Sequence, residues 1–304
     1  MSHVFGPVPS RRLGLSLGVD LIPLKTCTYD CLYCQVGRTT CQSIEIESFV
    51  PVTEVLDELE RKLEGCTPDA ITFSGSGEPT LSRDIERVIA FVKNRTDTKT
   101  VVLTNGSLLW REDVRKGISR ADMIMPTLTT AFEETFKLIH RPHSGLSLKT
   151  IIEGLKGLRL RYKGDLFLEV VLLAGINDSD KELEGLRKVI GQILPDRIQL
   201  NTIVRPPSDP RAISLDMKRL KEIKSLFGEK AEIIASPSLK QGIRQGESIT
   251  ATILEMAKRR PLRAEDVANV CDIPLEEAES LIKGLVVKAV LRQQEHEGEV
   301  YYSK

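Results

Sequence analysis

The sequence lacks a run of about 18 apolar residues, the length that a helix crossing a membrane requires. Its first seven residues carry neither the basic start nor the apolar middle of a secretory signal. It shows no internal repeat and no low-complexity segment. From these absences we expect a cytoplasmic protein with no membrane partner.

An excess of charge of either sign is also absent, because 43 Lys and Arg balance 43 Asp and Glu among 304 residues. This balance argues against nucleic-acid binding through overall charge, although a local basic patch would not appear in the sum. With 28% charged and 41% hydrophobic residues, the composition is globular and excludes disordered and fibrous proteins. The length allows one large domain with an appendage, or two domains.

Cysteine, by contrast, is concentrated in one part of the chain. The six cysteines are Cys27, Cys31, Cys34, Cys41, Cys66 and Cys271. In a reducing compartment the cluster of the first four is more typical of a metal or redox site than of disulfides. The spacing C-x3-C-x2-C of Cys27, Cys31 and Cys34 lets one short loop turn three thiolates toward a common centre.

Three thiolates suit an iron–sulfur cube with one open iron. Zinc usually needs two pairs of ligands, or a pair with histidines, and no histidine completes such a pattern nearby. Burial of the three cysteines as small apolar residues is the alternative. Cys41 could be a fourth ligand, but a fully ligated cluster would leave no iron free for a substrate, so we expect Cys27, Cys31 and Cys34 alone.

Apolar segments alternate with helical patterns in six β/α units. Strands are expected at 16–22, 70–74, 100–103, 123–126, 166–173 and 198–203. Helices are expected near 55–63, 85–94, 148–162 and 181–193, with another just before 123. Polar or Gly-rich breaks follow the strands, where the loops of a parallel sheet carry the chemistry. We predict an α/β fold, a partial (β/α)6 TIM-like barrel, with a doubly wound flat sheet as the alternative.

A compact helical pattern begins at residue 247. Helices at 250–260, 262–268 and 275–288 precede a hairpin of 290–292 with 300–302, which together resemble a small winged-helix domain. We therefore predict a barrel domain at 1–236, a linker at 237–246 and a winged-helix-like domain at 247–304.

The segment Cys27-Thr28-Tyr29-Asp30-Cys31-Leu32-Tyr33-Cys34, at the end of a first strand, resembles the three-cysteine loop of the radical S-adenosylmethionine (radical SAM) superfamily. Ser76-Gly77-Glu78-Pro79 is similar to the Gly-Gly-Glu-Pro turn of those enzymes, with serine in the first place. The resemblance spans about residues 10–235. Residues 5–14 and 141–145 are further similar to the iron–sulfur oxidoreductases near the wyosine tRNA-base synthases.

This resemblance implies a [4Fe–4S] cluster on Cys27, Cys31 and Cys34, with S-adenosylmethionine (SAM) chelated at the open iron. One electron, from a reductant protein such as a flavodoxin or ferredoxin, would cleave SAM to methionine and a 5′-deoxyadenosyl radical that abstracts hydrogen from a substrate. RNA, a protein or peptide, and a small metabolite all stay open as substrates. RNA is the weaker reading, because wyosine synthases carry a second set of three cysteines and the remaining cysteines here are scattered.

The resemblance also suggests positions that bind SAM. The backbone carbonyls of Ser76 and Gly77 would accept from the methionine amino group, since small side chains permit close approach. Glu78 would add charge there, or would be a solvated loop carboxylate. Tyr33 would meet the adenine, or would be a core aromatic.

Three further polar residues follow predicted strands or lie on them. Thr104 and Asn105 would bind the methionine carboxylate or the ribose, or would simply form a turn. Glu169 suits a ribose hydroxyl, or a pair with a buried cation.

Basic side chains stand where an anionic substrate could be held, at Arg11, Arg12, His140-Arg141-Pro142-His143 and Arg205. Guanidinium groups bind carboxylate or phosphate through paired donors. Solvated charge on surface loops is the equally weighted alternative. The sequence identifies no catalytic acid or base.

A function of a different class is a DNA-binding regulator that senses redox state or iron through the cluster. Residues 247–304 hold eight Lys and Arg against eleven Asp and Glu. The expected recognition helix opens with Glu276, Glu277 and Glu279, which would repel DNA phosphates. We therefore expect the winged helix to be a protein contact or a substrate lid rather than a DNA reader.

Overall fold

A curved sheet of eight strands is the framework of the computed structural model, which describes residues 2–234 and 249–304. In spatial order the strands are β1 (Val4–Ser10), β2 (Gly14–Val19), β5 (Ala70–Phe73), β6 (Lys99–Thr104), β7 (Met123–Pro126), β8 (Asp165–Val171), β9 (Arg197–Asn201) and β10 (Ala231–Ile233). β1 and β2 form an antiparallel hairpin, and every later pair of neighbours is parallel. Two short strands, β3 (Thr26–Cys27) and β4 (Cys41–Gln42), pair beside this sheet.

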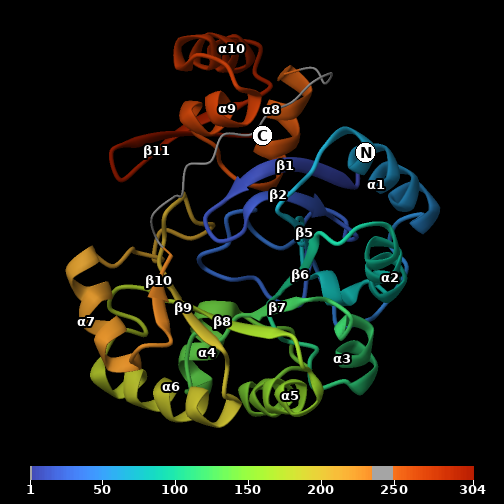
Figure 1. The fold of residues 1–304 in the computed structure, drawn as a ribbon. Helices are drawn as coiled ribbons and strands as arrows, with labels where there is room; N and C mark the ends of the chain where they lie inside the picture. Colours follow the sequence, from blue (N-terminus) through green and yellow to red (C-terminus); the bar gives the residue numbers. More distant parts are fainter. Residues whose placement is uncertain (1, 235–248) are drawn as a thin grey trace.

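The sheet bends into an arc, and helices lie along its outer side (Figure 1). The helices are α1 (Val52–Gly65), α2 (Ile85–Arg95), α3 (Glu112–Ile118), α4 (Glu133–His140), α5 (Leu148–Arg161), α6 (Asp180–Ile193) and α7 (Met217–Phe227). Alternate strand residues such as Ile71 and Phe73 pack with helix residues such as Leu59 and Val88 in the main core. The neighbouring positions on the strands therefore face the inside of the arc.

All six predicted strands are present, and they stand in the sheet in the order of the chain. A doubly wound sheet requires a point where this order reverses, so that alternative is wrong. An α/β fold with a mostly parallel sheet is confirmed. β1, β3, β4, β10, α4 and α7 were not predicted from the sequence.

The C-terminal segment consists of α8 (Ile249–Arg259), α9 (Ala264–Cys271), α10 (Leu275–Val287), β11 (Arg292–His296) and β12 (Glu299–Ser303). Its own core includes Ile253, Val267 and Ile282, and Val8 of β1 packs against that core. Three helices and a hairpin are therefore present as expected, whereas the winged-helix assignment stays a prediction. The predicted linker at 237–246 lies outside the described residues.

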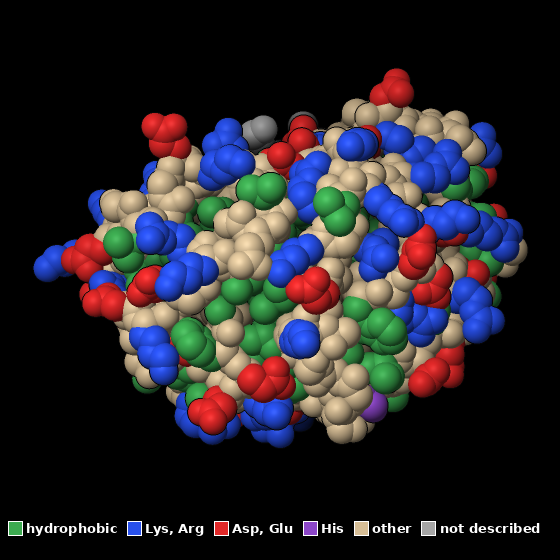
Figure 2. Space-filling model, turned by 90° about the horizontal axis from the view of Figure 1, so that it is seen from below, with side chains coloured by type: hydrophobic (Ala, Val, Ile, Leu, Met, Phe, Trp, Pro, Cys, Tyr) green, Lys and Arg blue, Asp and Glu red, His purple; other side chains and the backbone are tan. Residues whose placement is uncertain are grey.

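The surface shown in Figure 2 mixes charges of both signs. Lys and Arg are interspersed with Asp and Glu around small groups of hydrophobic side chains. Within 2–234 and 249–304, no helix has both the length and the apolar content needed to span a bilayer.

Candidate functional site

A cavity of about 430 Å³ is lined by the C-terminal parts of β5, β6, β7, β8 and β9, together with the β1–β2 hairpin. This volume is typical of sites for small molecules. Cys27, Cys31 and Cys34 all line the cavity. The structure therefore brings the three predicted ligands to the end of the sheet where the chemistry of parallel α/β folds occurs.

The other three cysteines lie elsewhere in the described structure. Cys41 is exposed on β4, Cys66 follows α1 and Cys271 ends α9. None of the three lines the cavity as the structure describes it. The sulfur donors available to a group in this cavity are thus those of the C-x3-C-x2-C loop.

The environment of these thiols bears on which group they fit. Burial, with the charge of Glu78 nearby, raises the pKa of the Cys27 thiol to about 12. Burial and the neighbouring thiols also raise the pKa of Cys31. Such thiols ionise only beside a strong positive charge, and three soft sulfur donors match iron–sulfur chemistry. Within the described ranges, no three His, Cys, Asp or Glu side chains are arranged to hold a single metal ion.

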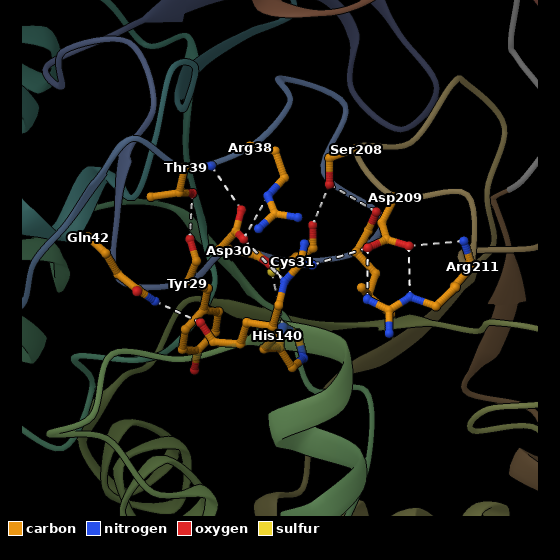
Figure 3. Close-up of polar contacts among 12 residues, drawn as sticks. Tyr29, Asp30, Cys31, Arg38, Thr39, Gln42, His140, Ser208, Asp209 and Arg211 are labelled. Carbon is orange, nitrogen blue, oxygen red and sulfur yellow. Dashed lines mark hydrogen bonds and ion pairs between the residues drawn. The ribbon is translucent and has the colours of Figure 1, made fainter.

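The cysteine loop is held between α4 and the loop after β9 (Figure 3). The amide of Asp30 donates to the His140 carbonyl at 2.9 Å, and that of Leu32 donates to the Ile139 carbonyl at 2.8 Å. On the other side, the Ser208 hydroxyl donates to the carbonyl of Cys31 at 2.8 Å. These bonds fix the loop backbone on both sides of Cys31.

Arg141 reinforces the same loop and does not line the cavity as predicted for an anion-binding residue. Its guanidinium pairs with Asp30 at 3.1 Å and with Asp209 at 3.1 Å. His143 also lies outside the cavity lining. The cavity lining thus includes neither Arg141 nor His143, and the predicted anion-binding role of segment 140–143 stays a prediction.

His140 contacts Cys31, one of the three predicted cluster ligands. It is fully buried, its Nδ1 lies 3.2 Å from Cys31 Sγ, and its Nε2 lies 2.7 Å from Thr129 Oγ1. Burial lowers the pKa of the imidazole to about 3, so the ring is neutral. No sequence pattern indicates this contact, since His140 and Cys31 are 109 residues apart along the chain.

The turn after β5 packs directly on the cysteine loop. A Cβ on Gly77 would lie 1.7 Å from the carbonyl oxygen of Thr26, and Gly75 adopts φ +146°. Glycine is required at position 77 because there is no room for a Cβ, and it is favoured at position 75 because of the positive φ. Gly75 and Gly77 line the cavity, where their backbone is open to a ligand.

Ser76 is not among the residues that line the cavity. Its hydroxyl donates to Asp20 at 2.6 Å, and its carbonyl accepts from the amide of Lys25 at 2.8 Å. The predicted role of this carbonyl toward SAM stays a prediction.

Glu78 is buried in the cavity wall, which excludes the solvated-loop alternative. Its carboxylate accepts from the hydroxyls of Thr80 at 2.5 Å and Thr104 at 2.6 Å, and from the amide of Asn105 at 2.7 Å. Burial raises its pKa, although these hydrogen bonds act in the opposite direction. Thr104 and Asn105 thus form a turn that also holds Glu78 in place.

Asn105 further connects this turn to the cysteine loop. Its Nδ2 lies 2.7 Å from Thr28 Oγ1 and 3.5 Å from Cys27 Sγ. Tyr33 lines the same cavity, with its ring edge-on to His140 at 5.7 Å between centroids. The predicted SAM-binding residues other than Ser76 are therefore gathered around the three cysteines.

Glu169 pairs with a cation, which was one of the two partners predicted for it, the other being a ribose hydroxyl. Arg12 lies 2.8 Å from its carboxylate, which also accepts from Asn201 at 3.1 Å. Burial alone would raise the pKa of Glu169, but Arg12 and Arg11 hold it below its ordinary value. Arg11, Arg12 and Arg205 all line the cavity, so the surface-loop alternative is wrong for them.

Comparison with known proteins decides the family. A model of the Radical SAM superfamily matches residues 21–186, more than half of the 304 residues. The chain belongs to the radical SAM superfamily. Members of this superfamily use a [4Fe–4S] cluster and S-adenosylmethionine, and membership implies reductive cleavage of SAM.

Several curated proteins are similar over most of this radical SAM chain. A UPF0026 protein of Methanocaldococcus jannaschii is 33% identical over 317 residues, which covers 100% of this chain and 96% of that protein. A UPF0026 protein of Helicobacter pylori is 34% identical over 278 residues, with 88% of both covered. A protein of Brachyspira hyodysenteriae named GTPase Obg is 38% identical over 292 residues. That match covers 95% of this chain but only 42% of the relative.

Solved structures share the fold at low identity. A radical SAM methyltransferase from Sphaerobacter thermophilus superposes with a TM-score of 0.54 at 16% identity, covering 72% of this chain and 66% of that one. A structure of TYW1 with a lysine-pyruvate adduct bound gives 0.53 at 17% identity, covering 75% and 76%. At these identities the likeness concerns the fold alone.

Proposed function

We propose that this radical SAM chain binds a [4Fe–4S] cluster through Cys27, Cys31 and Cys34, and that it abstracts hydrogen from a substrate held in the same cavity. The observation that carries this proposal is the position of the three thiols in one cavity at the C-terminal ends of the strands. When bound, the cluster supplies the electron that cleaves SAM to methionine and a 5′-deoxyadenosyl radical.

The chain's own residues would position SAM beside those thiols. The backbone of Gly75 and Gly77 is accessible from the cavity, and it would accept from the methionine amino group in place of the engaged carbonyl of Ser76. Glu78 adds a buried acceptor on the same side. Tyr33 would face the adenine. Glu169 would bind the ribose hydroxyl while its carboxylate stays paired with Arg12.

The C-terminal segment closes one wall of the cavity, because Met256, Arg259 and Arg260 line it. We assign this segment the role of a substrate lid, which would keep water from a reactive intermediate. The DNA-reading alternative gains no support, since α10 begins with Glu276 and Glu277. The reductant would be a small electron-transfer protein such as a flavodoxin or ferredoxin, and the substrate class is open among RNA, peptide and metabolite.

The first prediction tests cofactor chemistry. Anaerobically reconstituted and reduced protein should convert SAM to methionine and 5′-deoxyadenosine, slowly when substrate is absent. Cys31→Ser should lose cluster absorbance and at least about 100-fold of the cleavage rate, because removal of a ligand abolishes the site. Iron content, absorbance and product are measured together.

Cys41→Ser is the matched control and should behave like wild type, since Cys41 is exposed and outside the cavity lining. Equal losses in Cys41→Ser and Cys31→Ser would contradict the assignment of three ligands. Loss in neither variant would contradict an iron–sulfur site in this loop.

A further inference from the structure

Five arginines line the cavity, and four of them, from three separate parts of the chain, form a group. Arg11 and Arg12 lie between β1 and β2, Arg205 follows β9, and Arg260 follows α8. We call these four side chains the arginine cluster. Arg259 lines the same cavity but is not part of the cluster, because it is engaged by Asp20 at 3.2 Å and Glu255 at 2.7 Å.

The charge of the arginine cluster is only partly balanced. Arg12 pairs with Glu169 at 2.8 Å, and Arg205 contacts Asp266 at 3.3 Å. The Arg11 guanidinium donates to neutral acceptors instead, the Asn201 side chain and the Ile234 carbonyl, each at 3.1 Å.

Arg260 is the least satisfied member of the cluster. Its guanidinium lines the cavity and, among the described residues, has neither a hydrogen bond nor an ion pair, although the charge of Asp266 acts to raise its pKa. Within the cluster, four guanidiniums thus face the two carboxylates of Glu169 and Asp266, which leaves an excess of two positive charges. The other buried carboxylate of the cavity wall, Glu78, is bonded to Thr80, Thr104 and Asn105 instead.

The electrostatics of these side chains agree with an excess of positive charge. Burial, followed by the charges of Arg12 and Arg205, lowers the pKa of Arg11 to about 10. Burial and the charge of Arg205 likewise lower the pKa of Arg260 to about 10. Both groups stay protonated at neutral pH, so the protein holds partly desolvated like charges together. Such an arrangement costs stability unless an anion completes it.

We infer that the arginine cluster is a subsite for a phosphate monoester of the substrate, and that Arg260 of the C-terminal segment closes it. This inference rests on the proposed function and narrows its substrate to a phosphorylated small molecule. A phosphate monoester carries close to two negative charges at neutral pH, which matches the two uncompensated cations, whereas a carboxylate carries one. Its three oxygens can accept from guanidiniums that approach from different elements.

The test measures binding of inorganic phosphate to the full chain by calorimetry and by the shift in melting temperature. Phosphate should bind wild type and raise its melting temperature, because a ligand that binds only the folded state stabilises it. Arg11→Gln and Arg260→Gln should each weaken phosphate binding by about tenfold or more, the usual effect of losing a hydrogen bond to a charged group. Without phosphate, Arg260→Gln should melt no lower than wild type, since it relieves repulsion.

Arg197→Gln is the matched control, because Arg197 is exposed at the opposite end of β9. It should bind phosphate as wild type does. The inference is overturned if phosphate does not bind, or if Arg197→Gln weakens binding as much as Arg260→Gln. Tighter binding of malonate would point to a carboxylate substrate instead, and tighter binding of an RNA oligonucleotide without a terminal phosphate would point to RNA.

Different results would contradict the proposed function and the phosphate subsite. Phosphate binding without any SAM cleavage by the reconstituted protein contradicts the proposed function. SAM cleavage without phosphate binding contradicts the subsite alone.

Discussion

At the scale of single residues, His140 sets the hydrogen bonding of Cys31. A thiolate has no proton to donate, so a ligating Cys31 must accept from Nδ1 of the imidazole, which lies 3.2 Å away. Nε2 must then accept from the hydroxyl of Thr129 at 2.7 Å. The buried, neutral ring therefore has one defined tautomer in the cluster-bound protein.

The prediction for His140 concerns redox potential. His140→Phe keeps the ring contacts with Tyr29 and Phe136 but removes the N–H donor. Hydrogen bonds to sulfur favour the more negative, reduced cluster, so the variant should have a reduction potential lower by roughly 40 mV, the equivalent of about 1 kcal/mol. A titration followed by electron paramagnetic resonance measures it. If His140→Phe and wild type had the same reduction potential at equal iron content, the His140 ring would contribute only packing.

Residue-scale predictions from the sequence were strongest where the chemistry is local. Cys27, Cys31 and Cys34 share one loop, so their spacing was enough to predict that they lie together, whereas Glu78 was predicted through the family resemblance of its turn; all four line the cavity. The contact of His140 with Cys31 joins residues 109 positions apart, and Arg260 reaches the cavity from the far end of the chain. Contacts of this kind depend on how elements pack, which residue spacing does not encode.

At the scale of elements, the turn from β5 into the short 3-10 helix Pro79–Leu81 is locked to β3 through Gly77. Gly77→Ala should destabilise the protein by about 1–3 kcal/mol, because the added methyl meets backbone that cannot easily yield. Gly191→Ala is the control, since its Cβ would meet open space in α6. That change should be neutral or stabilising by up to about 1 kcal/mol. Urea unfolding measures both, and equal stabilities would contradict the close contact.

The predicted and the missed elements differ in how clearly residues mark them. Buried strands such as β5 and β6 are largely apolar runs, and a polar residue, Ser74 or Thr104, stands at the C-terminal end of each. β1 was missed because Gly6, Pro7 and Pro9 interrupt its pattern, which an edge strand tolerates. β10 and α4 are short, whereas α7 does carry an apolar spacing, through Leu220 and Ile223, that the sequence analysis left unused.

At the scale of the whole molecule, one ion pair joins the first and last parts of the chain. Arg259 of α8 lies 3.2 Å from Asp20, and the two side chains are only 8% and 5% exposed. Asp20 also accepts from the amide and hydroxyl of Ser76. The C-terminal segment is thereby connected to the glycine turn beside the cysteines.

Arg259→Met should destabilise the full chain by about 3–5 kcal/mol, because it leaves the Asp20 charge buried without its partner. Lys283→Met, at an exposed pair with Glu279, should change stability by less than about 1 kcal/mol. Combining Arg259→Met with Asp20→Asn should recover part of the lost stability. Chemical unfolding of wild type, the two single variants and the double variant would measure this coupling. Additive losses would show that the pair is not coupled.

The position of α8 in the cavity wall has a consequence for biosynthesis. Ribosomes release the cysteine loop long before Arg259 and Arg260, and N-terminal parts generally fold first. If these thiols hold the proposed cluster, the side of the cavity that α8 covers would still be open during synthesis, and we expect iron and sulfide to enter there before the last helix docks.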